Sequence, residues 1–109
     1  MKHVKYAEKS VLMGDDAADT LMDYARMLAN AGNADTVTLR VISPDGNAVD
    51  ASFLLTPSTE LMVESTNSGL DEPENDETVR TMRERIAAPH PAAVTETEAP
   101  WILESRDEF

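Results

Sequence analysis

Residues 35–65, DTVTLRVISPDGNAVDASFLLTPSTELMVES, decide the fold of this chain. Apolar and polar residues alternate from Val37 to Val41 and again from Val49 to Leu55, which is the period of a half-buried strand. Turn-forming residues at 43–47 separate these two segments, and a third alternating segment follows at 61–65. We therefore expect three strands joined by two tight hairpins.

The register of the first hairpin follows from its two faces. Closing Ser43 on Asn47 gives a three-residue loop and places Gly46 at the left-handed position that such loops require. Opposed residues share a face, and a two-residue loop would wrongly set Val41 against Asp50. The predicted pairs are Val41–Val49, Leu39–Ala51 and Val37–Phe53 on the buried face, and Arg40–Asp50 and Thr38–Ser52 on the outer face.

The second hairpin is expected to close Thr56 on Glu60. No glycine in this turn favours a particular loop type. The predicted pairs are Leu55–Leu61 and Phe53–Val63 on the buried face, and Leu54–Met62 and Ser52–Glu64 on the outer face.

Two helices complete the predicted α+β fold. Apolar residues at helical spacing predict one helix from residues 14–16 to about Ala31 and another from Asp76 to Ala87, the second capped by Asn75 or Asp76. Residues 3–6 and 10–13 form either a small hairpin or one bulged strand. We expect an antiparallel sheet of about four strands, in the order β-α-β-β-β-α, with both helices on one face. Residues 1–87 form the single predicted domain, and 88–109 a proline-containing acidic tail.

The charge of the chain limits its partners. A formal net charge of −12 argues against binding to nucleic acids and to anionic membranes, because both attract cationic surfaces. The absence of cysteine excludes disulfides and thiolate chemistry. No segment is apolar enough for a signal peptide or a membrane span, so we expect a cytoplasmic protein with a protein partner.

Few residues indicate catalysis or metal binding. The sequence contains no nucleophile elbow and no phosphate-binding glycine loop, and His3 and His90 lie in a terminal segment and a proline linker. Asp15, Asp19 and Asp23 follow one side of the first helix, at a spacing at which carboxylates can bind a hard cation. One exposed helix face supplies too few ligands, so we interpret them as a solvated face. No catalytic residue, cofactor or metal is predicted.

The tail contains an apolar cluster, Trp101, Ile102 and Leu103, among acidic residues. This cluster includes the only tryptophan of the chain. In one interpretation it docks into a groove of its own domain or of a neighbouring copy. In the other it is a short linear motif that becomes ordered on a partner.

Four short motifs are distributed along the predicted domain, Gly14–Asp19, Ala34–Val37, Phe53–Leu55 and Met82–Arg85. In these motifs the chain resembles small acidic actinobacterial proteins of uncharacterised function. The resemblance extends over about Lys5 to Ile86 and implies no activity.

The open face of the predicted sheet is the expected interaction surface. It is polar at Thr38, Arg40 and Ser52, but it carries the apolar pair Leu54 and Met62. We therefore predict a non-catalytic interaction module that forms a homodimer through this face or through an edge strand, with the tail cluster as a further contact. An acidic inhibitor or antitoxin-like protein that binds a basic groove is the alternative. A carboxylate-dependent enzyme is the least favoured class.

Overall fold

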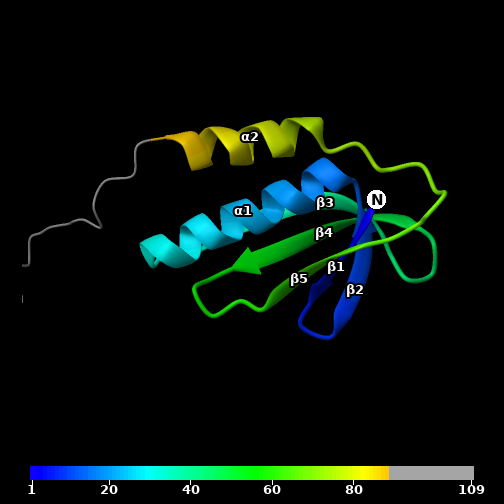
Figure 1. The fold of residues 1–109 in the computed structure, drawn as a ribbon, viewed down its shortest axis with the longest axis horizontal. Coiled ribbons are helices and arrows are strands. Elements are labelled where there is room, and N and C mark those ends of the chain that lie inside the picture. The colour runs from blue at the N-terminus through cyan, green and yellow to red at the C-terminus, as the bar shows by residue number, and fades with distance from the viewer. Residues whose placement is uncertain (89–109) are drawn as a thin grey trace, which may run out of the picture.

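The computed structural model describes residues 1–88 and confirms the α+β class. Both helices lie on the same side of the sheet (Figure 1). The elements are β1 (Lys2–Tyr6), β2 (Lys9–Met13), α1 (Asp15–Ala31), β3 (Asp35–Ile42), β4 (Ala48–Leu55), β5 (Leu61–Ser65) and α2 (Asp76–Ala87).

The hairpin of β3 and β4 has the predicted register at every pair. Val37 lies opposite Phe53, and the predicted outer pairs are also formed. The amide of Ser43 donates to the carbonyl of Asn47 at 2.8 Å, and Gly46 has a φ of +90°. The three-residue loop therefore closes as expected, with glycine at the left-handed position.

The sheet has five strands, whereas about four were expected. Their order is β4-β3-β2-β1-β5. β1 and β2 form a hairpin around Ala7 and Glu8, which decides between the two alternatives for the N-terminal segment. Between β2 and β3, a single pair joins Leu12 to Ile42. The sheet thus consists of two halves, and β1 and β2 run across the direction of β3 and β4 (Figure 1).

The predicted pairing of β4 with β5 is wrong. β5 instead pairs with β1, where Val63 lies opposite Val4. The ring of Tyr6, on β1, makes an edge-on contact with Phe53 at 5.6 Å between centroids, and its hydroxyl donates to the carbonyl of Leu54 at 2.7 Å. β1 alternates in the same way as β4, so it offers β5 an equally suitable buried face.

The core lies between the sheet and the helices. α1 packs against β1 and β5, while α2 packs against α1 and approaches β3. No helix in residues 1–88 is both long enough and apolar enough to cross a membrane. The largest fully buried side chains are Met13, Leu21, Leu39, Leu55, Met82, Val4 and Val41.

A substitution of Phe53 provides a test of the register of β3 and β4, because this side chain is only 4% exposed and contacts Tyr6. We expect Phe53→Ala to lower the free energy of unfolding by about 3–5 kcal/mol, as other large-to-small core substitutions do. Urea denaturation followed by circular dichroism measures this loss. An unchanged unfolding midpoint would contradict the inward position of Phe53.

Candidate interaction surface

The polar side chains of the predicted surface bind one another across β3 and β4. The hydroxyls of Thr38 and Ser52 are 2.8 Å apart, and Arg40 Nη1 donates to Asp50 Oδ1 at 3.1 Å. All four side chains are on the outer face of the hairpin, as predicted. Their hydrogen-bonding groups are therefore partly satisfied within the hairpin, and the charge of Asp50 is balanced.

The two apolar residues of the predicted surface are exposed but do not form a pair. Leu54 is 54% exposed and lies opposite Thr36, while Met62 is 48% exposed and lies opposite Lys5. Their separation follows from the pairing of β5 with β1. Val49, which was expected to be buried, is 38% exposed.

β4 has a free edge on the side away from β3. The amide and carbonyl of Arg40 bind the side chain of Asn75, so Arg40 and Asp50 are not a hydrogen-bonded pair of the ladder. By alternation, the main-chain groups of Asp50, Ser52 and Leu54 all point away from β3. The carbonyl of Leu54 accepts hydrogen bonds from Tyr6 and from Thr59. Within residues 1–88, no hydrogen bond reaches the outward main-chain groups of Asp50 and Ser52.

β3 also has an open edge, because it meets β2 at one pair only. The side-chain amide of Asn75 closes one end of this edge. Its Oδ1 accepts from the amide of Arg40 at 2.7 Å, and its Nδ2 donates to the carbonyl of Arg40 at 2.8 Å. Asn75 does occupy the N-cap position of α2, but its side chain makes no capping bond. A carboxamide has the donor and acceptor of a peptide unit, so Asn75 stands in for a neighbouring strand.

A cluster of Tyr24, Asp35 and Arg85 closes the other end of the open edge. Arg85 Nη1 donates to Asp35 Oδ2 at 2.7 Å and to the Tyr24 hydroxyl at 3.2 Å, and this hydroxyl donates to the same carboxylate oxygen at 2.5 Å. The hydrogen bond from Tyr24 holds the pKa of Asp35 below its ordinary value, and the charge of Arg85 adds to this effect. Burial, followed by the contact with Asp35, raises the pKa of Tyr24.

A groove of about 310 Å³ lies between these two closures, along the edge of β3 and the side of α2. By the same alternation, the main-chain groups of Thr36 and Thr38 point toward this edge. The Thr36 amide binds the side chain of Asp35. Within residues 1–88, the Thr36 carbonyl and both main-chain groups of Thr38 have no hydrogen-bond partner. The lining residues are Thr36, Val37, Thr38, Glu77, Thr78, Thr81, Met82 and Arg85.

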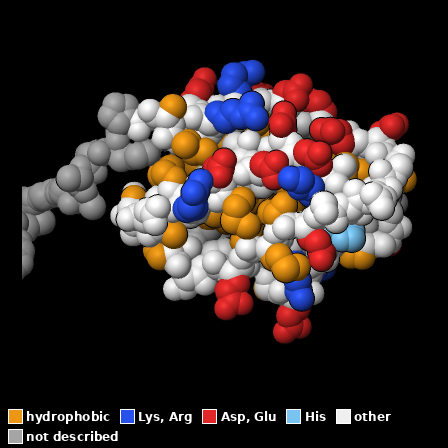
Figure 2. Space-filling view, in the orientation of Figure 1, with side chains coloured by type: hydrophobic (Ala, Val, Ile, Leu, Met, Phe, Trp, Pro, Cys, Tyr) orange, Lys and Arg blue, Asp and Glu red, His pale blue; other side chains and the backbone are white. Residues whose placement is uncertain are grey.

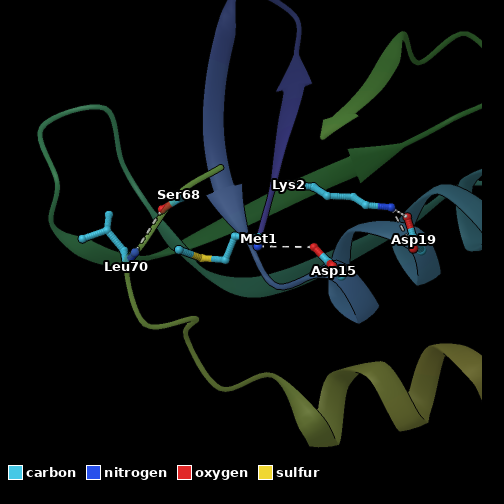
Figure 3. Close-up of polar contacts among 6 residues, drawn as sticks. All are labelled: Met1, Lys2, Asp15, Asp19, Ser68 and Leu70. Carbon is cyan, nitrogen blue, oxygen red and sulfur yellow. Dashed lines mark hydrogen bonds and ion pairs between the residues drawn. The ribbon is translucent and has the colours of Figure 1, made fainter. Parts of the chain in front are cut away.

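The aspartates of α1 each lie beside a cation. Asp15 is 3.3 Å from the amino group of Met1, Asp19 is 2.8 Å from Lys2 Nζ, and Asp23 is 3.0 Å from Arg26. The first two pairs tie the start of β1 to α1 (Figure 3). No group of three or more potential metal ligands occurs in residues 1–88. This arrangement agrees with a solvated, ion-paired helix face.

A second hollow, of about 550 Å³, lies between α1, α2 and the segment that precedes α2. It is lined by both acidic and basic side chains, and Arg83 approaches Asp16 at 3.7 Å. Figure 2 shows the same mixture of charges over the helices, without a field of one sign. This hollow therefore provides no cluster of like charges for a ligand.

Other predicted residues contribute little to a site. His3 Nδ1 is 3.9 Å from the carboxylate of Glu64 on the neighbouring strand. His90 and the tail cluster Trp101, Ile102 and Leu103 lie outside the described residues. Comparisons with protein-family models, with curated proteins and with solved structures found no match to this chain.

Substitutions of Asn75 distinguish between two roles of its side chain, pairing with the edge of β3 and capping of α2. Aspartate is as good a helix cap as asparagine, but it cannot donate to the carbonyl of Arg40. We expect Asn75→Asp and Asn75→Ala each to lower the free energy of unfolding by about 0.5–1.5 kcal/mol, because an exposed main-chain group of Arg40 loses its hydrogen-bond partner. Urea denaturation at pH 7 measures both values. If Asn75→Asp were as stable as the wild type, the side chain would act as a cap.

The Asp35 cluster predicts a dependence of stability on pH. Because the pKa of Asp35 is lower in the folded state, its contribution is complete above the ordinary carboxyl value of about 3.9 and is lost as the pH falls below it. We expect Asp35→Asn to lower the melting temperature at pH 7 and to weaken the loss of stability below pH 4. The matched control is Asp23→Asn, whose carboxylate pairs with Arg26 on the exposed surface. Equal pH profiles for the two variants would contradict the prediction.

Proposed function

We propose that this protein is a non-catalytic interaction module that forms a homodimer by pairing β4 with β4 of a second copy. The free edge of β4 is the observation that supports this proposal. Asp50 and Ser52 present main-chain groups with no partner in residues 1–88, and such an edge is a template for another strand. Two antiparallel copies of one strand are related by a twofold axis, which is the commonest symmetry of dimers.

The side chains of β4 favour this contact despite the acidity of the chain. Asp50 is the only charged residue between Ala48 and Leu55, and its partner Arg40 balances it at 3.1 Å. Val49 and Leu54 add exposed apolar surface along the same strand. Two copies can therefore approach along β4 without bringing unbalanced charges together.

Ser52→Pro tests the strand pairing directly. The amide of Ser52 points away from β3, so proline removes a donor that the ladder of β3 and β4 does not use. We expect the wild type to sediment at twice the 11.9 kDa mass of one chain, and Ser52→Pro to sediment as a folded monomer.

Leu54→Lys provides a second test, and Leu70→Lys is its matched control. Leu54 and Leu70 are 54% and 55% exposed, but only Leu54 lies on β4. We expect Leu54→Lys to weaken the dimer and Leu70→Lys to leave its mass unchanged. A monomeric wild type, or equal effects of the two lysines, would contradict the proposal.

The acidic inhibitor or antitoxin-like protein remains the alternative, and the ion pairs on α1 give it less support. Binding of a basic groove by the acidic surface would weaken steeply with salt, because charges are screened beyond about 8 Å at physiological ionic strength. Strand pairing predicts a dimer with little salt dependence. Sedimentation at low and high salt therefore separates the two proposals.

A further inference from the structure

We propose that the tail segment Trp101–Leu103 adds as a short strand to the open edge of β3, in the groove beside α2 of the same chain. This inference uses a different edge from the proposed dimer, so it does not depend on self-association. Residues 89–109 lie outside the described part of the chain. The argument rests on the groove, on the position of Ala88 and on the sequence that follows it.

The edge of β3 is already bound by one peptide-like group. Asn75 makes both main-chain hydrogen bonds to Arg40, as a residue of a neighbouring strand would. Two residues further along the same edge, the amide and carbonyl of Thr38 have no partner within residues 1–88. An added strand would continue the pairing that Asn75 begins, which is how extended peptides bind to sheet edges.

The path of α2 brings the tail to this groove. Asn75, at the start of α2, binds Arg40, and Arg85, near its end, binds Asp35. α2 therefore runs along the open edge of β3, and the tail leaves Ala88 at the Asp35 end. The twelve residues 89–100 can span about 40 Å when extended, whereas the twelve residues of α2 extend over about 18 Å. The tail cluster can thus reach every part of the groove.

The chemistry of the cluster fits an added strand. Tryptophan and isoleucine favour strands, and Pro100 precedes the cluster at a position where a strand can begin without a donor. In an extended segment Ile102 points to the opposite face from Trp101 and Leu103. The groove offers an apolar floor at Val37 and Met82 to the side chain that points inward.

The chain itself provides a specific probe, because it has one tryptophan and no cysteine. A bimane label on a single cysteine at Glu77→Cys, on the wall of the groove, reports contact with Trp101 by quenching of its fluorescence. Arg83→Cys is the matched control, because it is on α2 but outside the groove and nearer to the start of the tail. A tail without a fixed site would quench this control at least as strongly.

We expect quenching at Glu77→Cys, its loss when Trp101→Phe is added, and little quenching at Arg83→Cys. Equal quenching at both positions, or quenching that survives Trp101→Phe, would overturn the proposal. The measurement is made in the Ser52→Pro background and repeated on dilution. Its outcome therefore does not depend on whether the proposed β4 dimer forms. If labelled Trp101→Phe chains are quenched only after unlabelled wild-type chains are added, a second copy supplies the tail and the same-chain proposal is wrong.

Hydrogen exchange provides an independent test in the full chain. We expect the Thr38 amide to exchange about tenfold faster when Trp101, Ile102 and Leu103 are all replaced by serine, which corresponds to the loss of about one hydrogen bond. The Leu39 amide faces β4 and serves as the internal control. An unchanged Thr38 rate would show that the tail does not pair with this edge.

Discussion

The single pair between Leu12 and Ile42 is the constraint on which the rest of the structure depends. It is the only pair between β2 and β3, so it joins the half of the sheet formed by β4 and β3 to the half formed by β2, β1 and β5 at one point. Beyond this pair β2 and β3 diverge, and the strands of the two halves run in different directions. Divergence leaves β3 with an open edge, and α2 lies along that edge instead of a strand. Asn75 and Arg85 fix α2 there through hydrogen bonds at its two ends. The interaction surfaces are therefore consequences of the way in which the sheet is divided.

Several features of the fold were predictable because local chemistry decides them. The loop between β3 and β4 contains a glycine that its geometry requires, and both faces of the hairpin independently favour one register. The bounds of α2 follow from acidic residues at its start and prolines after its end. The exposure of Leu54 and Met62 also followed from alternation alone.

The remaining features depend on which elements become neighbours in the fold, and the alternation of apolar and polar residues does not specify this. A period of two tells which residues of β5 point inward, but both β4 and β1 offer a matching face. In the structure the ring of Tyr6, on β1, contacts Phe53 where β5 was expected. The sequence predicts Asn75 or Asp76 as the cap of α2, because asparagine and aspartate are both preferred at that position, and it does not indicate that Asn75 binds the edge of β3. The groove along β3 requires the divergence of β2 from β3 and the position of α2 beside the open edge, so the sequence carried no separate signal for it.

The pairing of β1 with β5 also affects the order in which the sheet can form while the chain is being synthesised. Lys2 lies opposite Ser65, so one edge of β1 has no strand to pair with until the residues up to Ser65 have been synthesised. The hairpins β1–β2 and β3–β4 need only nearby residues, and contacts of short sequence separation form fastest. Until β5 emerges from the ribosome, the edge of β1 is open to other nascent chains. Lys2 and Lys5 lie in β1 and Lys9 lies in β2, and these three lysines provide the charge that discourages such encounters.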